Sequence, residues 1–189
     1  MKIAKEYQKD IYCLEGDWNS DLRNKMSVKS TLVYLNDCLN IKHIHRPCAT
    51  AEQFNYYMTE YNKKRYSKYS ILYLAFHGNP NEIFLGKDKI DLDLFEETNL
   101  GLFKNKIIHF GSCSSLNISK RRLKQFVKNT NALCLSGYKT DIEFNKSTVL
   151  DILYFEKLGC YKDIRCVERD MNKEYRELVK TLEFTMIYD

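Results

Sequence analysis

Three short segments of the chain are almost entirely apolar, without a polar residue at every second position. They are "SILYLAFHG" (70–78), "KIIHFG" (106–111) and "ALCLSGY" (132–138). A strand exposed on one face alternates apolar and polar residues, whereas an inner strand of a parallel sheet is covered on both faces and is apolar throughout. These segments therefore predict inner strands of a sheet whose two faces are both covered by helices.

Helical patterns separate and flank these segments. Thr50 and Ser119 stand where a side chain can cap the start of a helix. The segment 81–97 departs from the rhythm and predicts a small surface hairpin after the third strand, around a turn at Gly86. The alternation of elements predicts a three-layer α/β/α sandwich with a mostly parallel central sheet, in a single domain over residues 1–189. The remaining expected elements are strands over 10–16, 41–48 and 183–189 and helices over 27–40, 51–66, 119–130, 147–159 and 163–182.

The composition narrows the class of protein. The first ten residues lack the apolar region of a secretory signal, and no apolar run is long enough to span a membrane. Seven cysteines, an odd number without a Cys-x-x-Cys pair, argue against a disulfide framework and a zinc ribbon, and reduced thiols predict a cytoplasmic protein. The net charge is only +5, and the basic runs at 63–65 and 120–122 have helical patterns typical of solvated faces, so no nucleic-acid partner is expected.

Two of the inner strands are followed by side chains that can carry out chemistry. His77-Gly78 ends one apolar run, and Cys113 follows the next strand along the chain. Ligands bind beyond the carboxyl ends of parallel strands, so neighbouring strands would bring this imidazole and this thiol into one cleft. A thiol becomes nucleophilic when a nearby imidazole takes its proton. The backbone N–H groups of Gly78 and Cys113 could then bind the oxyanion that forms during acyl transfer.

These same residues resemble a known clan. "ILYLAFHG" followed by "IIHFGSCSS" is similar to the caspase-like cysteine peptidases, which include caspases, metacaspases, clostripain and the bacterial CHAT domains. The resemblance covers about residues 9 to 189 in element order. It implies a caspase-like cysteine endopeptidase with Cys113 as nucleophile, His77 as general base and Gly78 as an oxyanion-hole residue.

The resemblance also carries expectations about specificity and biology. Metacaspases place an aspartate two residues before the cysteine, where this chain has Gly111, so it lies closest to the bacterial CHAT-type domains. Asp141 or Glu143, in the loop after the next strand, and Ser112 are the expected substrate-binding residues. No metal or organic cofactor is implied. The expected partners are a protein or peptide substrate and an activator, which could be a partner protein, a second copy or a small ligand, in a defence response.

Other interpretations stay open. The chain could be a catalytically inactive binding module on the same fold. A nucleotide-binding domain of the flavodoxin or Toll/interleukin receptor type is disfavoured, because "LEGDWNSD" (14–21) has one glycine and no phosphate-binding loop. His109, within a strand, is expected to be a packed core residue. His43 and His45 share a strand face but lack a third metal ligand in view. Trp18 either lines the edge of the sheet or covers the core.

Overall fold

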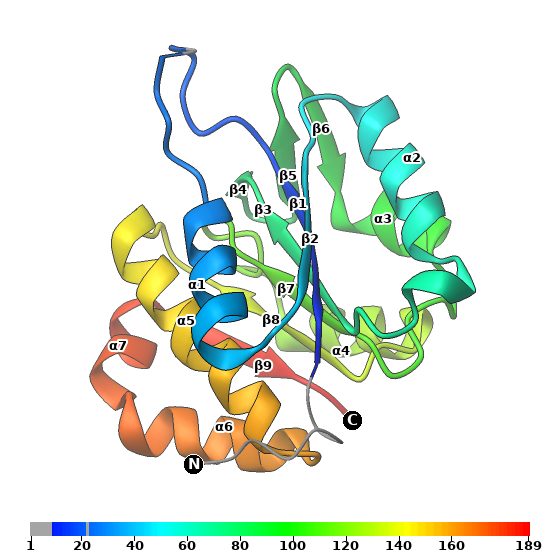
Figure 1. Cartoon of the computed structure of the whole chain (residues 1–189). Coiled ribbons are helices and arrows are strands. Elements are labelled where there is room, and N and C mark those ends of the chain that lie inside the picture. The colour runs from blue at the N-terminus through cyan, green and yellow to red at the C-terminus, as the bar shows by residue number, and fades with distance from the viewer. Residues whose placement is uncertain (1–8, 22) are drawn as a thin grey trace.

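The computed structural model describes residues 9–21 and 23–189. Their backbone forms a six-stranded sheet in the order β2-β1-β3-β7-β8-β9, in which β9 runs antiparallel to β8 and the other neighbours are parallel. The predicted mostly parallel α/β sandwich is therefore confirmed (Figure 1). The strands are β1 (Ile11–Glu15), β2 (His43–Pro47), β3 (Ile71–Ala75), β7 (Ile107–Phe110), β8 (Cys134–Tyr138) and β9 (Phe184–Ile187).

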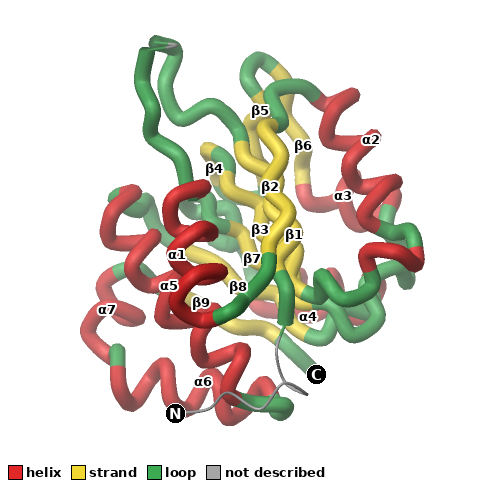
Figure 2. Tube along the Cα trace, in the orientation of Figure 1, coloured by secondary structure: helices red, strands yellow, loops and turns green. Residues whose placement is uncertain are grey.

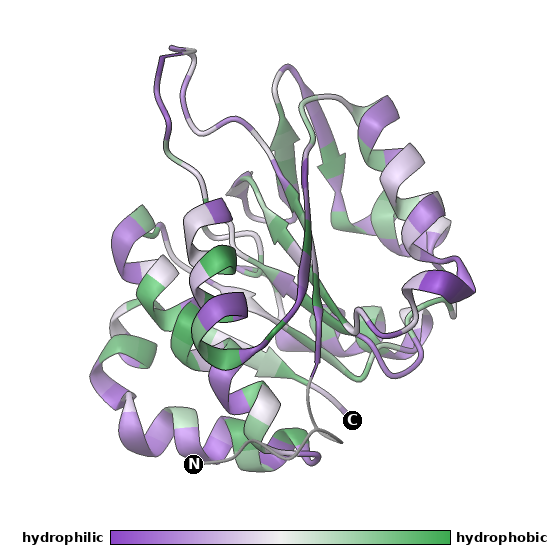
Figure 3. Cartoon of the chain, in the orientation of Figure 1, coloured by the Kyte–Doolittle hydropathy of each residue, from purple (hydrophilic) through white to green (hydrophobic). Residues whose placement is uncertain are grey.

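Helices cover both faces of this sheet. One face packs against α1 (Lys29–Leu39), α5 (Phe144–Cys160), α6 (Ile164–Glu174) and α7 (Arg176–Thr181), and the other against α2 (Ala51–Tyr61), α3 (Leu92–Thr98) and α4 (Lys120–Thr130). Strand β3 shows why the apolar run is continuous. Leu72 and Leu74 pack into one hydrophobic cluster, whereas Ile71, Tyr73 and Ala75 pack into the other. Along α1 and α5, hydrophobic and hydrophilic stretches alternate as each helix turns toward and away from the sheet (Figure 3).

The helix starts agree with the predicted caps, but several helix bounds differ. Thr50 accepts a hydrogen bond from the backbone of Gln53, and Ser119 does the same for Arg122. The predicted helix over 51–66 ends at residue 61, and a short 3₁₀ turn follows at 64–66. The predicted helix over 147–159 begins three residues earlier, at 144. The predicted helix over 163–182 bends at Tyr175 into two, α6 and α7.

The segment after β3 is more elaborate than the predicted hairpin. It forms a three-stranded antiparallel sheet, β4 (His77–Asn79), β5 (Glu82–Leu85) and β6 (Asp88–Asp91), seen at the upper end of the large sheet in Figure 2. The second predicted hairpin strand stops at Asp91, because this side chain accepts a hydrogen bond from the Leu94 backbone and starts α3. The predicted hairpin is present as β5 and β6, which pair antiparallel across the turn at 86–87. One of its faces packs into the core, where Ile83 and Leu85 are buried.

No helix among the described residues is long and apolar enough to cross a membrane.

Candidate active site

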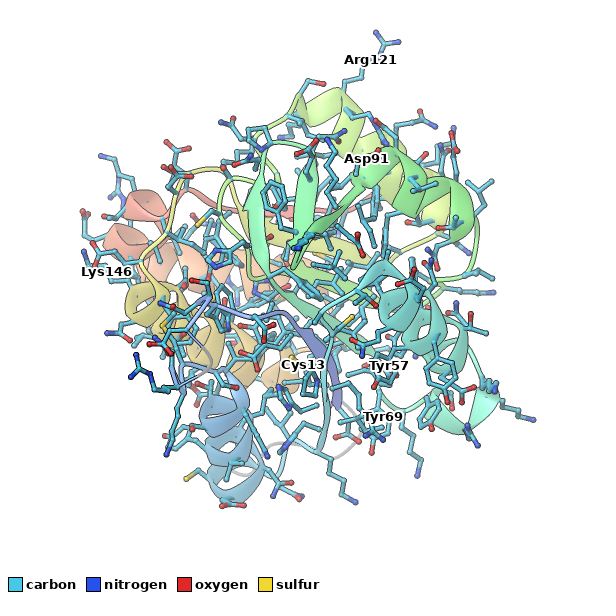
Figure 4. The ribbon with its side chains drawn as sticks, turned by 90° about the horizontal axis from the view of Figure 1, so that it is seen from above. Cys13, Tyr57, Tyr69, Asp91, Arg121 and Lys146 are labelled. Atoms are coloured by element: carbon cyan, nitrogen blue, oxygen red, sulfur yellow. The ribbon has the colours of Figure 1, made fainter. Side chains whose placement is uncertain are left out.

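The two candidate catalytic residues follow neighbouring strands. Strands β3 and β7 pair in parallel, and the Gly111 N–H donates to the Leu74 carbonyl oxygen at 2.9 Å, just beyond the last paired residues. His77 is the first residue of β4, and Cys113 lies in the loop after β7. Both side chains line one cavity, as the sequence predicted. Figure 4 looks down on this edge of the sheet, with Cys13 of β1 near the centre and Lys146 of α5 at the rim.

The cavity is small and draws its walls from four connections. Its volume is about 100 Å³. The connection after β1 contributes two side chains, and the connections after β3, β7 and β8 supply the others together with the first turn of α5. The lining residues are Trp18, Met26, His77, Gly111, Cys113, Ile142, Phe144 and Ser147.

Cys113 is half-buried and held by the connection after β8. The Ile142 N–H donates to Sγ at 3.5 Å, and Sγ lies 3.8 Å from the Ile142 carbonyl oxygen. A backbone N–H directed at sulfur stabilises negative charge on it. The next residue, Ser114, has a positive φ of 45°, and its N–H donates to the Thr140 carbonyl oxygen at 2.9 Å. Backbone hydrogen bonds thus join the sharp turn that carries the thiol to the connection after β8.

His77 is exposed, and one hydrogen bond settles its tautomer. Its Nε2 lies 3.0 Å from the carbonyl oxygen of Trp18. A carbonyl only accepts, so Nε2 carries the proton and, in the neutral imidazole, Nδ1 is the nitrogen able to accept one. The indole ring of Trp18 stands against the imidazole with centroids 5.3 Å apart and planes at 72°. Trp18 therefore orients the histidine and lines the cavity, and it also packs against the hydrophobic core, so that both of its predicted places apply.

A buried carboxylate fixes Trp18 in turn. Glu15, at the end of β1, accepts hydrogen bonds from Trp18 Nε1 at 2.6 Å, Ser27 Oγ at 2.6 Å and the Val28 N–H at 2.7 Å, and His45 Nε2 lies 2.6 Å away. Burial raises the pKa of the Glu15 carboxyl, but hydrogen bonds from His45, Ser27, Trp18 and Val28 outweigh burial, and the net pKa lies below its usual range. Sequence reasoning missed Glu15, since only the folded loop brings these donors together.

Two glycines allow the loops to approach closely. A Cβ on Gly78 would lie 2.8 Å from the Cys113 carbonyl oxygen and closer still to Ser115 Oγ. Any larger residue would therefore push the histidine and cysteine loops apart. A Cβ on Gly111 would lie 2.5 Å from Tyr73 Cε2. Tyr73 thus occupies the space that an aspartate two residues before the cysteine would need.

Comparison with known proteins places the chain in a family. The model of a family of unknown function, DUF6642, matches residues 8–188. This chain belongs to DUF6642. No curated protein matches it. The family brings no activity with it, so the function of this DUF6642 protein has to be inferred from its cavity.

The predicted substrate-binding residues do not line the cavity of the DUF6642 chain. Ser112 is fully buried and pairs with the hydroxyl of Ser115. Asp141 is exposed and accepts from Ser114 Oγ at 3.2 Å. Glu143 is exposed and forms an ion pair with Lys146 at 2.7 Å. The apolar residues that alternate with these acids, at 142 and 144, face the cavity instead.

The predicted core histidine is confirmed. His109 is fully buried, with Nε2 2.8 Å from Asp151 Oδ1 and Nδ1 3.0 Å from Ser136 Oγ. The same carboxylate accepts from the hydroxyls of Tyr73, at 2.7 Å, and Tyr138. This network holds Tyr73 rigidly beneath Gly111, so His109 supports the floor of the site without lining the cavity.

The two histidines of β2 differ in their surroundings. His45 is engaged by Glu15, whereas Nδ1 of His43 is buried without a hydrogen-bond partner. Burial and the neighbouring His45 lower the pKa of His43. Within residues 9–21 and 23–189, no group of three or more histidine, cysteine or acidic side chains is arranged to hold a metal ion.

Proposed function

We propose that this protein is a caspase-like cysteine peptidase in which Cys113 is the nucleophile and His77 the general base. One observation supports the proposal most strongly: the thiol and the imidazole line the same cavity beyond the carboxyl ends of adjacent parallel strands. The hydrogen bond from Nε2 to the Trp18 carbonyl oxygen leaves Nδ1 as the proton acceptor, as a general base requires.

In the proposed first step, His77 Nδ1 takes the proton of the Cys113 thiol, and Sγ attacks the carbonyl carbon of a peptide bond. Before attack, the Ile142 N–H at 3.5 Å from Sγ helps the sulfur to carry negative charge. The carbonyl oxygen then becomes an oxyanion, for which the N–H groups of Gly78 and Cys113 are the proposed donors.

In the second step the tetrahedral intermediate collapses. The C–N bond breaks, and the imidazolium of His77 gives its proton to the departing amine. The acyl group remains on Sγ as a thioester. His77 then takes a proton from a water molecule, whose oxygen attacks the thioester carbonyl carbon. The C–S bond breaks, the carboxylic acid product leaves, and the imidazolium returns its proton to Sγ, which restores the thiol.

The wider biology belongs to the same proposal. A cytoplasmic location is supported by the odd number of cysteines without a Cys-x-x-Cys pair. Activation by a partner protein, a second copy or a small ligand, and a role in defence, are supported by the resemblance of "ILYLAFHG" and "IIHFGSCSS" to the bacterial CHAT-type domains.

The test is cleavage of a fluorogenic peptide library by the wild type and by Cys113→Ala and His77→Ala. We expect the loss of either group to lower kcat/KM at least about 100-fold. The matched control is Cys166→Ala, because Cys166 is also half-exposed but lies on α6, outside the cavity. Undiminished turnover by Cys113→Ala would refute the assignment.

Alkylation by iodoacetamide at neutral pH covers the case in which no form cleaves a peptide. An enzyme awaiting its activator is expected to be alkylated at Cys113 faster than at Cys160 or Cys166, and the preference is expected to disappear in His77→Ala. A Cys113 that reacts no faster than these two thiols would favour an inactive binding module instead.

A further inference from the structure

The walls of the cavity beside Cys113 are apolar. Its apolar lining side chains are those of Trp18, Met26, Ile142 and Phe144, and the Trp18 and Phe144 rings pack with centroids 5.1 Å apart. The backbone of Gly111 completes the wall without a side chain.

The polar groups around the cavity already have partners. Trp18 Nε1 donates to Glu15, and Ser147 Oγ donates to the backbone carbonyl oxygens of Glu143 at 3.2 Å and Phe144 at 3.0 Å. Apart from the imidazole of His77, the described lining residues include no ionisable group but the thiol itself. An ammonium, guanidinium or carboxylate entering this space would lose its water without gaining an opposite charge, which is strongly unfavourable.

The two acidic residues that flank Ile142 in the sequence do not place a negative charge in the cavity. Asp141 and Glu143 flank Ile142, but Asp141 accepts from Ser114 and Glu143 pairs with Lys146 outside the cavity. Over residues 141–144 the side chains point alternately outward and inward. The apolar residues at 142 and 144 therefore face the cavity, and the acidic residues at 141 and 143 face solvent.

The volume sets the size of the occupant. A dry cavity of roughly 150 Å³ binds benzene, which has six carbon atoms. By proportion, a cavity of about 100 Å³ accommodates about four carbon atoms, the size of a leucine or isoleucine side chain. A phenylalanine or tryptophan side chain is too large unless the walls move.

We propose that this cavity binds a leucine-sized apolar side chain of the substrate, on the residue whose carbonyl carbon Cys113 attacks. That residue is the natural occupant because its side chain is only two bonds from the reacting carbon, and Cys113 lies in the cavity wall. The inference rests on the proposed peptidase function and names its substrate class: peptides cleaved after leucine or a residue of similar size, not after lysine, arginine or aspartate.

The first experiment compares acetylated tripeptide coumarylamides that differ only in the residue before the scissile bond. Leucine is expected to be cleaved with a kcat/KM at least about 100-fold above lysine, aspartate and tryptophan. Equal or faster cleavage after lysine or aspartate would overturn the specificity while leaving the peptidase function intact.

A second experiment reads the pocket without peptide hydrolysis. Peptidyl chloromethyl ketones with leucine, lysine or aspartate at this position alkylate a thiolate, forming an S–C bond as chloride leaves. Faster modification of Cys113 by the leucine reagent is expected, and equal rates for all three would overturn the proposal. If the leucine reagent is preferred but no peptide is cleaved, the pocket stands, and the iodoacetamide comparison decides between an enzyme awaiting its activator and an inactive binding module.

A negative charge introduced into the cavity wall tests the proposed preference for leucine over lysine. Met26 lies at the rim, 40% exposed, so Met26→Glu is expected to fold and to raise the lysine-to-leucine ratio at least about tenfold, because the new carboxylate pairs with the ammonium. Val149→Glu is the matched control: Val149 is 51% exposed on α5 and outside the cavity, so the ratio is expected to stay unchanged. An unchanged ratio in Met26→Glu would also overturn the proposal.

Discussion

Replacing Glu15 by glutamine tests whether one buried carboxylate fastens the loop that carries Trp18. The substitution keeps the size of the side chain and removes its charge. One carboxylate oxygen faces Trp18 Nε1 and the Val28 N–H, and the other faces Ser27 Oγ and His45 Nε2. In glutamine, the amide oxygen can still accept from the first pair, while the amide nitrogen must face the hydroxyl and the imidazole.

The size of the effect follows from the hydrogen bonds. A hydrogen bond to a charged group contributes about 1.5–3 kcal/mol, against about 0.5–1.5 kcal/mol between neutral groups. Loss of charge at four contacts is partly offset because a neutral amide is easier to bury. We expect Glu15→Gln to lower the free energy of unfolding by about 2 kcal/mol and Tm by roughly 4–8 °C. The exposed pair of Glu143 with Lys146 provides the control, and Glu143→Gln is expected to change stability by less than about 1 kcal/mol.

The effect also has a defined pH dependence. The pKa of Glu15 is lowered in the folded protein, so the ionised carboxylate contributes its stability above the unfolded value of about 4.3 and loses it as the pH falls through the folded pKa. The difference between wild type and Glu15→Gln is therefore expected to be full at pH 7 and to shrink below about pH 4. Urea unfolding of both proteins, followed by circular dichroism at pH 7 and below about pH 4, measures this difference in the free energy of unfolding. A difference under about 0.5 kcal/mol at pH 7, or one that grows in acid, would refute the reasoning.

Two further substitutions probe the floor of the site. Gly111→Ala places a methyl group 2.5 Å from Tyr73 Cε2, and because Asp151 holds the Tyr73 hydroxyl, we expect a loss of about 1–3 kcal/mol in urea unfolding; an unchanged midpoint would show that the ring can move. Asp151→Ala leaves the hydroxyls of Tyr73 and Tyr138 and Nε2 of His109 without their acceptor, and we expect a loss of at least about 3 kcal/mol by calorimetry. A fall in Tm of less than about 5 °C would contradict that role.

The sheet was predictable because its inner strands are covered on both sides. The apolar runs at 70–78, 106–111 and 132–138 contain β3, β7 and β8, with each strand beginning within two residues of its run. A short, continuous apolar run between segments with helical spacing is best explained as an inner strand that helices cover on both faces. The small sheet was only half predicted, because β4 has three residues and Asp91 can equally continue a strand or start a helix.

The site was predictable where it depends on topology and unpredictable where it depends on loops. The carboxyl ends of adjacent parallel strands lie side by side at one edge of the sheet. The position of Cys113 and His77 in one cavity therefore followed from the order of the elements. Whether Glu143 or Phe144 faces that cavity depends on the start of α5 and on the ion pair with Lys146. Those contacts form only when the loops fold, and no spacing rule describes them.

The place of Trp18 has a practical consequence. It is the only tryptophan of the chain. Its ring packs against those of His77 and Phe144, and its indole N–H donates to Glu15. Indole emission shifts with the polarity and hydrogen bonding of its surroundings, and no other indole contributes to the signal. The fluorescence of the unlabelled protein therefore reports on this one edge of the sheet, so that binding of a peptide or loss of the loop can be followed without a dye.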